Sequence, residues 1–186
     1  MKTNNTLDEN TIKLLKSFIG KKLIELKHDP IIFSYTSYGV VYLNISKNIY
    51  SITDFYENFN CFDENNDISV LKINNNIKEV KSYLKDTNLI SVNVNQKINS
   101  ITIVNGASYI TKNNSEYVFE DTYGIIFTLE DNYQFAFEKD DYGENIRIYR
   151  GYNLIDKFKY LKNDFETETY DQKYNPKFEF NIIDLK

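Results

Sequence analysis

The spacing of apolar residues near the start of the chain predicts a helix over residues 8–19. Ile12, Leu15 and Ile19 recur at the interval that places side chains on one helical face. Asp8 stands where an N-cap is expected, and its carboxylate can accept a hydrogen bond from a free N–H of the first turn. We therefore expect an amphipathic helix that covers one apolar surface.

Alternation of apolar and polar residues predicts that most of the remaining chain forms short strands. Two polar stretches, residues 54–67 and 105–116, interrupt this pattern and are predicted to be loops. Val80 and Leu84 share one face of a second predicted helix over residues 77–85. The predicted strands cover residues 21–27, 31–35, 39–45, 49–53, 68–73, 89–94, 98–104, 117–120, 123–129, 133–138 and 145–150.

This order of elements predicts an α+β fold with antiparallel sheets, built from two β-meanders that each follow a short helix. The segment 38–42, Tyr-Gly-Val-Val-Tyr, resembles the segment 123–127, Tyr-Gly-Ile-Ile-Phe, which suggests an internal duplication. Val41 and Ile126 would then be equivalent; the alternative is common turn chemistry before two unrelated strands. The predicted organisation is a first half, a second half that shares its core, and a charged tail with a candidate edge strand, at residues 1–75, 76–163 and 164–186.

Composition supports a packed, β-rich protein in a reducing compartment. Hydrophobic residues make up 41% of the chain, with 16 Tyr and 13 Phe but no Trp, and β-branched and aromatic residues favour strands. Cys61 is the only cysteine, so no disulfide can form within the chain. No apolar run reaches membrane-spanning length, and the N-terminal residues lack the apolar core of a signal peptide. We expect a cytoplasmic protein without a membrane segment. The abundance of Asn, Lys, Ile and Tyr suggests an AT-rich bacterial or phage genome.

Charge is distributed unevenly, and this bounds the class of partner. The net charge is -5. Residues 116–171 hold 14 acidic and 6 basic side chains, a balance of -8, whereas residues 1–115 hold 11 acidic and 13 basic ones, a balance of +2. A uniformly basic nucleic-acid binder would not have this pattern, so no direct nucleic-acid binding is expected. The acidic half could contact a basic partner, imitate nucleic acid, or only keep the protein soluble.

Catalytic and cofactor signatures are absent from the sequence pattern. His28 and Cys61 could form a nucleophilic pair, but neither has the local setting of such a site. The acidic stretch 63–67 lacks the central glycine and distal glutamate of a calcium loop. No glycine-rich phosphate loop or dinucleotide fingerprint occurs. We therefore expect a protein that is not an enzyme and that has no cofactor and no metal ion.

Candidate contact residues are concentrated around the predicted turn at residues 138–144. Turns at sheet ends are exposed, so its carboxylates are predicted to be solvated and close together. The two arginines of the chain follow on the next predicted strand, where each either forms an internal ion pair or anchors a ligand. Tyrosine supplies apolar area with a polar tip and is favoured at interfaces. The predicted partner-binding residues are Glu138, Asp140, Asp141, Tyr142, Glu144, Arg147, Tyr149 and Arg150.

These features favour a protein-interaction module over an enzyme. The leading hypothesis is a bacterial or phage inhibitor or immunity-type protein that blocks a partner with a basic surface through its acidic, tyrosine-rich side. One alternative is a small-ligand binder with a tyrosine-lined pocket and an arginine anchor. Another is a carboxylate- or metal-dependent hydrolase that uses the 138–144 loop.

Overall fold

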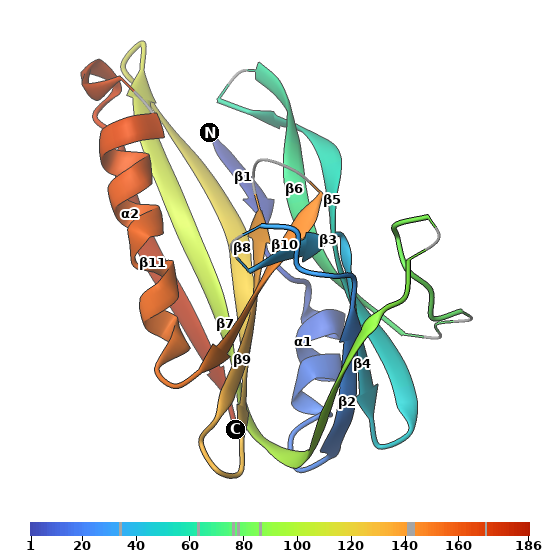
Figure 1. The fold of residues 1–186 in the computed structure, drawn as a ribbon. Coiled ribbons are helices and arrows are strands. Elements are labelled where there is room, and N and C mark those ends of the chain that lie inside the picture. The colour runs from blue at the N-terminus through green and yellow to red at the C-terminus, as the bar shows by residue number, and fades with distance from the viewer. Residues whose placement is uncertain are drawn as a thin grey trace.

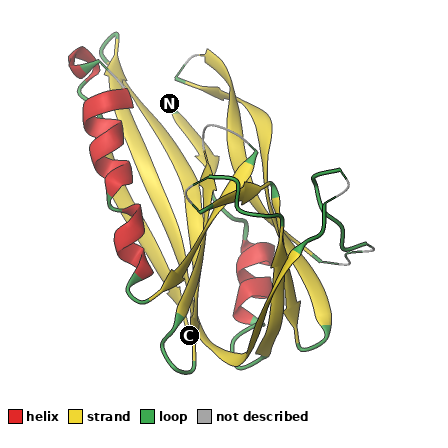
Figure 2. Ribbon diagram, viewed as in Figure 1, coloured by secondary structure: helices red, strands yellow, loops and turns green. Residues whose placement is uncertain are grey.

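A computed structural model shows a chain dominated by β-strands (Figures 1 and 2). Its described residues contain eleven strands and two α-helices. No helix in this part of the chain is long and apolar enough to span a membrane. The structure describes residues 1–33, 35–62, 64–75, 77, 79–85, 87–140, 144–169 and 171–186.

The strands form one sheet, with the order β3-β10-β9-β8-β7-β2-β4-β5-β6 along its main path. Of the pairs among the described residues, only that of β1 with β8 is parallel, and β11 pairs antiparallel with β7. The strands are β1 (Lys2–Asn5), β2 (Lys22–His28), β3 (Thr36–Tyr38), β4 (Val40–Ile45), β5 (Asn48–Cys61), β6 (Glu64–Asn74), β7 (Ile90–Lys112), β8 (Ser115–Leu129), β9 (Gln134–Asp140), β10 (Asn145–Gly151) and β11 (Lys177–Leu185).

The sheet curls, so that β3 at one end of the strand order is joined directly to β4 through Gly39. This residue alone separates β3, which pairs with β10, from β4, which pairs with β2 and β5. Its N–H donates to the carbonyl of Glu144 at 2.8 Å, and its own carbonyl accepts from the N–H of Asp54 at 3.0 Å. A Cβ at this position would lie 3.2 Å from both the Glu144 carbonyl and the Phe55 ring. The close approach of three backbone segments therefore favours glycine.

Two hydrophobic cores lie on the two faces of the strands β7 to β10. Alternation along β8 separates them, because Ile125 and Phe127 belong to the main core inside the curl and Ile126 belongs to the second core. The helix α1 (Glu9–Lys16) contributes Leu15 to the main core, and its N-cap Asp8 accepts from the Thr11 N–H at 2.7 Å.

The second core is covered by the segment that follows β10. This segment comprises the 3-10 turn η1 (Leu154–Phe158), the short helix α2 (Tyr160–Asp164) and the π-helical turn η2 (Phe165–Thr169), and a 3-10 turn η3 (Gln172–Tyr174) leads to β11. In Figure 1, α2 lies beside β7 and β11, on the opposite side of the sheet from α1. Phe158 and Phe178 are fully buried in this second core.

The predicted α+β fold with two helix-preceded meanders is wrong. The described residues form one curled sheet, and the helix expected over residues 77–85 is absent from residues 77 and 79–85. Side chains replace the helical carbonyls there, because the Tyr83 N–H donates to Asp29 Oδ2 at 2.8 Å and the Leu84 N–H to Ser82 Oγ at 3.0 Å. Ser and Asp side chains often compete with helical hydrogen bonding in this way.

The suggested duplication does not match the packing. Val41 and Ile126, the proposed equivalents, are both buried, but Val41 lies in the main core and Ile126 in the second core. The second series of strands also has no preceding helix in the described residues. The resemblance between segments 38–42 and 123–127 therefore reflects similar local sequence on strands that face different cores.

Two predicted loops are strands instead. The polar stretch 54–67 belongs largely to the β5–β6 hairpin, where cross-strand partners such as Asn58 and Asp67 hydrogen-bond to each other at 3.2 Å. The stretch 105–116 continues β7 into β8, and β11 pairs along the other edge of β7. Neighbouring strands on both sides satisfy the backbone of β7, which a polar sequence alone does not reveal.

Candidate functional site

Strand register brings four of the eight predicted contact residues into one ionic network. Glu138 on β9 lies directly opposite Arg147 on β10, and Asp140 is two residues further along. Arg147 Nη2 donates to Asp140 Oδ1 at 3.0 Å, and Arg147 Nη1 lies 3.7 Å from Glu138 Oε2. The hydroxyls of Tyr149 and Tyr160 donate to Glu138 at 2.7 and 2.6 Å. Glu138 is therefore in contact with Arg147 and with two tyrosine hydroxyls.

The predicted solvation of these carboxylates is wrong for Glu138 and Asp140, which are 0% and 8% exposed. Burial is possible because Arg147 and the tyrosine hydroxyls compensate the charge of Glu138. Asp140 is further fixed by its N–H, which donates to Asp54 Oδ2 at 3.1 Å.

Three other predicted contact residues lie in or beside the turn. Asp141 and Tyr142 lie outside the described residues. Glu144 is half-buried, and the structure assigns its backbone carbonyl to the contact with Gly39. Asp140 and Glu144, the described residues on either side of the turn, are thus each fixed by a backbone hydrogen bond.

Burial perturbs the titration of this network. Burial raises the pKa of Tyr149 and of Tyr160, and the negative charge of Glu138 raises both further. Burial alone would lower the pKa of Arg147, but Tyr160, Glu138 and Asp140 outweigh it and raise the pKa above its ordinary value. The two hydroxyls therefore stay protonated as donors and Arg147 stays charged.

A second buried ion pair lies next to this network. Lys139 Nζ pairs with Asp121, and their side chains are 1% and 3% exposed. The ammonium also donates to the Ser69 carbonyl at 2.9 Å and lies 5.2 Å from the centroid of the Tyr123 ring. Because a buried charge is costly without compensation, this arrangement rigidly fixes the floor between β6, β8 and β9.

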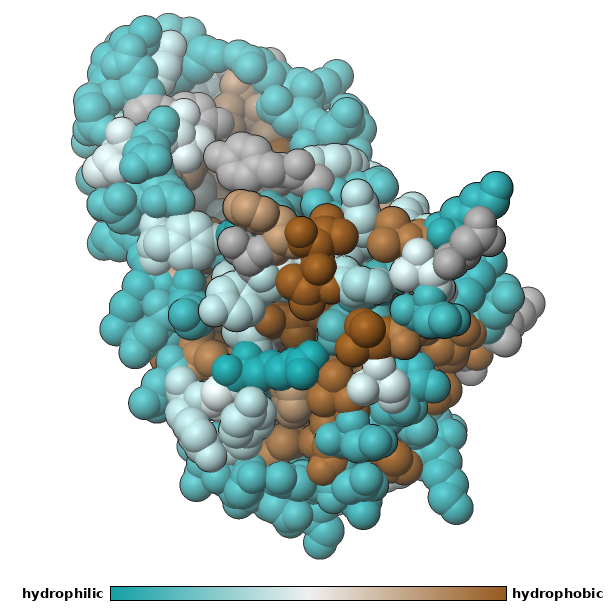
Figure 3. All heavy atoms as spheres, viewed as in Figure 1, coloured by the Kyte–Doolittle hydropathy of each residue, from teal (hydrophilic) through white to brown (hydrophobic). Residues whose placement is uncertain are grey.

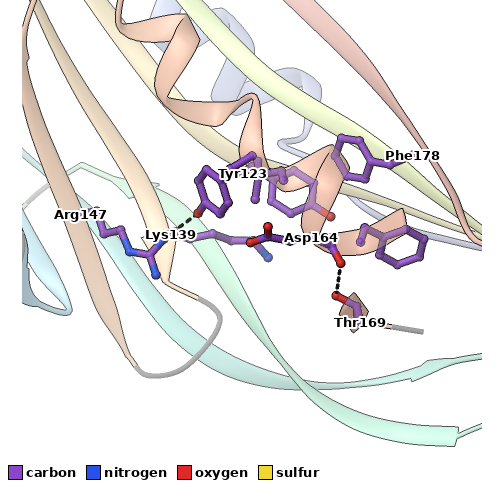
Figure 4. A pocket seen from close by; sticks show the side chains of 9 residues that line it. Tyr123, Lys139, Arg147, Asp164, Thr169 and Phe178 are labelled. Carbon is purple, nitrogen blue, oxygen red and sulfur yellow. Dashed lines mark hydrogen bonds between the residues drawn. The ribbon is translucent and has the colours of Figure 1, made fainter. Parts of the chain in front are cut away.

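A cleft of about 270 Å³ opens above these charges, between the sheet and the segment α2–η2 (Figure 4). Thr169 Oγ1 donates to the backbone carbonyl of Asp164 at 3.1 Å and closes one wall. Within the described residues, the Asp164 carboxylate itself has no hydrogen-bond or ion-pair partner. The cleft is lined by Tyr123, Lys139, Arg147, Tyr160, Leu161, Asp164, Phe165, Thr169 and Phe178.

The cleft continues into a neighbouring hollow of about 190 Å³ beside the β5–β6 hairpin. The two spaces share Tyr123, Lys139, Phe165 and Thr169. Aromatic rings from remote parts of the chain meet at this second space; the hollow adds Phe62 and Phe119, whose ring centroids lie 6.4 Å apart. Both spaces contain charged and aromatic side chains, and the hollow also has Asp67 and Asp121 in its lining.

Arg150, the second predicted arginine, contacts His28 instead of an acid. Its Nη2 lies 2.9 Å from His28 Nε2, while His28 Nδ1 lies 2.6 Å from the Asp29 carbonyl. A guanidinium only donates and a carbonyl only accepts, so the geometry requires neutral His28 with its proton on Nδ1. Burial lowers the pKa of His28, and Arg150 lowers it further. The unfolded chain therefore binds the second imidazole proton of His28 more tightly than the folded chain does. Stability is lost as the pH falls below the ordinary pKa of 6.5.

A different part of the surface exposes many large apolar side chains. Pro30 ends β2, and the loop after it presents Phe33 at 75% exposure, although residues 31–35 are predicted to form a strand. Figure 3 shows hydrophobic atoms in the middle of this face, over the loop before β3, extending toward the segment after β6. We define the apolar surface by the exposed residues of these two segments and of the start of β7: Ile31, Ile32, Phe33, Tyr35, Val80, Tyr83 and Ile90.

Asp29 ties the two segments of the apolar surface together. Its buried carboxylate accepts from the Ser82 hydroxyl and from the Tyr83 N–H, and its carbonyl accepts from the Ser37 hydroxyl at 2.9 Å. Tyr35 has a positive φ of 76°, which is unusual for a residue with a side chain, and its ring lies 5.4 Å from that of Tyr149. Hydrogen bonds to Asp29 therefore fix the backbone that carries the exposed apolar side chains.

Cys61 and His28, the candidate nucleophilic pair, each contact other residues in the structure. Cys61 is buried, and its Sγ contacts Asn66 Nδ2 at 3.5 Å, while both ring nitrogens of His28 are occupied by Asp29 and Arg150. Burial raises the pKa of the Cys61 thiol, which disfavours the reactive thiolate. Within the described residues, no group of three or more His, Cys, Asp or Glu side chains is placed to hold a metal ion.

Comparison with known proteins yields no relative: no family model, no curated protein and no solved structure matches the chain. The site must therefore be interpreted from its own geometry. Sequence reasoning missed Lys139, Asp164 and Tyr160, because no local pattern signals that α2 folds back over β9. The apolar surface did have a signal, the run Ile31-Ile32-Phe33 after Pro30, but a short apolar run is equally typical of a strand.

Proposed function

We propose that this protein is a non-enzymatic binding module that acts by occupying a partner protein, in the manner of an inhibitor or immunity protein. The single observation that carries this proposal is the apolar surface. Soluble monomers expose isolated apolar side chains, but a contiguous group rimmed by polar residues is typical of an interaction site. Here two loops expose several large apolar side chains, of which Phe33 is the most exposed.

The fixed base of the apolar surface supports binding without large rearrangement. Asp29 joins its two loops, and the Tyr35 carbonyl accepts from the Ile148 N–H on β10 at 2.8 Å. A surface that is ordered before binding loses less conformational entropy when it binds. Each apolar side chain buried by a partner contributes about 25 cal/mol per Å² of apolar area removed from water. Phe33 has the largest exposed fraction of these residues and is the expected energetic centre.

The charges next to the apolar surface favour a partner that carries carboxylates. Lys157 lies 5.7 Å from the centroid of the Tyr149 ring, and Arg150 contacts His28 at the same end of the sheet. Neither cation forms an ion pair within the described residues. The acids expected to attract a basic partner, Glu138 and Asp140, are buried. We therefore propose a partner whose contact area is apolar at its centre and acidic at its edge.

Affinity capture with three forms of the protein tests this proposal. Phe33→Asp places a charge at the centre of the apolar surface, and Phe180→Asp is a matched control on β11, where Phe180 is 37% exposed. We expect the same partner to be captured by the wild type and by the Phe180 variant, and to be lost with the Phe33 variant. A partner that all three forms retain equally would place the interface elsewhere.

A further inference from the structure

The cleft beneath α2 contains a guanidinium and a carboxylate that can each still bind a ligand. Arg147 uses Nη1 for the Tyr160 hydroxyl and Nη2 for Asp140, and a guanidinium has five N–H donors. These two hydrogen bonds and an interaction with Tyr149 do not use all five donors, so N–H groups remain for a ligand at the cleft. On the wall formed by α2, the half-buried carboxylate of Asp164 has both oxygens without a partner there. Figure 4 shows Arg147 and Asp164 at this cleft, with Lys139 drawn between them in this view.

This pairing selects against ligands that carry only one charge. An isolated carboxylate would meet Arg147 but also the negative charges of Asp164, Glu138 and Asp140. An isolated ammonium would meet Asp164 but also the cations Arg147 and Lys139. Like charges at close range inside a partly buried site are repelled far more than in water. A molecule that carries both an ammonium and a carboxylate can contact Asp164 with the first and Arg147 with the second, and it adds no net charge.

The apolar part of the site defines the body of the ligand. Tyr123 and Phe178 meet edge to face at 5.5 Å between centroids, and Phe165 lies 6.2 Å from Phe178. Beyond them, Phe62 and Phe119 are the aromatic residues that the adjoining hollow adds, beside polar side chains such as Ser69. Aromatic rings favour a ring or a large aliphatic group packed at offset or edge-to-face geometry. Volumes of about 270 and 190 Å³ suit a small molecule and not a folded segment.

We propose that this cleft binds a free α-amino acid with an aromatic or large apolar side chain. The carboxylate accepts from the free N–H donors of Arg147, and the ammonium donates to Asp164. The side chain enters the aromatic hollow that adjoins Lys139 and Phe165. This site is distinct from the apolar surface, and its ligand would bind whether or not a protein partner is present.

The test uses three probes that differ by one charged group at a time. L-phenylalanine carries both charges, 3-phenylpropionate lacks the ammonium, and phenethylamine lacks the carboxylate. Binding of each to the full-length protein is measured by calorimetry. We expect saturable binding of L-phenylalanine, and binding at least tenfold weaker for each of the other two probes.

Two variants connect the binding to the cleft. Asp164→Asn removes the carboxylate that we assign to the ammonium, and Glu168→Gln neutralises an exposed acid nearby on η2 as a matched control. Asp164→Asn should weaken L-phenylalanine at least tenfold. It should not weaken 3-phenylpropionate, because it removes a like charge from the site, while Glu168→Gln changes neither. No saturable binding of L-phenylalanine, equal affinity for L-phenylalanine and 3-phenylpropionate, or no effect of Asp164→Asn would each overturn the proposal.

Discussion

Replacing Lys139 with methionine should destabilise the protein far more than breaking an ion pair at the surface. The side chains of Lys139 and Asp121 are 1% and 3% exposed, so the variant leaves a carboxylate buried without its cation. Asp121 keeps a hydrogen bond from Asn5 Nδ2 at 3.0 Å, which compensates only part of its charge. Removing one partner of a buried pair costs about 3–5 kcal/mol, and we expect a loss of this size in the free energy of unfolding.

A matched control is the ion pair of Glu120, the residue that precedes Asp121 on β8. Lys2 pairs with Glu120 at 2.8 Å, and their side chains are 60% and 30% exposed. Lys2→Met should therefore cost less than about 1 kcal/mol. Urea unfolding followed by far-UV circular dichroism measures both variants, because the chain has no Trp for a fluorescence signal.

The double variant Lys139→Met/Asp121→Asn separates charge from packing. If the buried charge is the cause, the double variant recovers part of the loss, with a coupling energy of about 1–3 kcal/mol. A cost below about 1 kcal/mol for Lys139→Met, or strictly additive single losses, would show that water screens this pair. That result would refute the reasoning that the buried Lys139–Asp121 pair is shielded from water.

Three further outcomes are expected. Gly124→Ala should cost about 1–3 kcal/mol in unfolding experiments, because its Cβ would lie 2.5 Å from the Phe158 ring; a neutral effect would show that the second core is loose. Between pH 6.5 and the lowered pKa of His28, the wild type should lose up to about 1.4 kcal/mol per pH unit, and His28→Gln should flatten this slope; equal slopes would assign it to other groups. Asp29→Asn should speed amide exchange at Tyr83, whose N–H donates to the carboxylate, and unchanged exchange would show that the link is not required.

Local patterns predicted local structure well. The cap Asp8 and the apolar spacing of α1 are confirmed, since the information needed lies within one turn of helix. The strand predicted over residues 39–45 corresponds closely to β4. By contrast, the polar stretches in β5, β6 and β7 depend on pairing with distant strands, and the segment 77–85 depends on a carboxylate from β2's end. Such dependence on remote partners cannot be derived from spacing.

The candidate sites illustrate the same limit. Glu138, Arg147 and Tyr149 were singled out from their sequence proximity, and register does bring them together. Their burial arises from Tyr160, which α2 places over β9, and no pattern within residues 138–150 indicates that cover. Phe178 reaches the same cleft from β11 at the far end of the chain. Residue types near one another thus indicated a cluster, but its exposure depended on tertiary packing.

The most direct test of the proposed binding function is the dissociation constant of the captured partner for wild type, Phe33→Ala and Phe180→Ala. Phe33 is 75% exposed, so its replacement should change the free energy of unfolding by less than about 0.5 kcal/mol. Loss of the central apolar contact should weaken the partner by about 2 kcal/mol, which is roughly thirtyfold. Phe180→Ala should stay within about twofold of wild type. Equal affinities for all three forms would contradict the proposal that the apolar surface is the binding site.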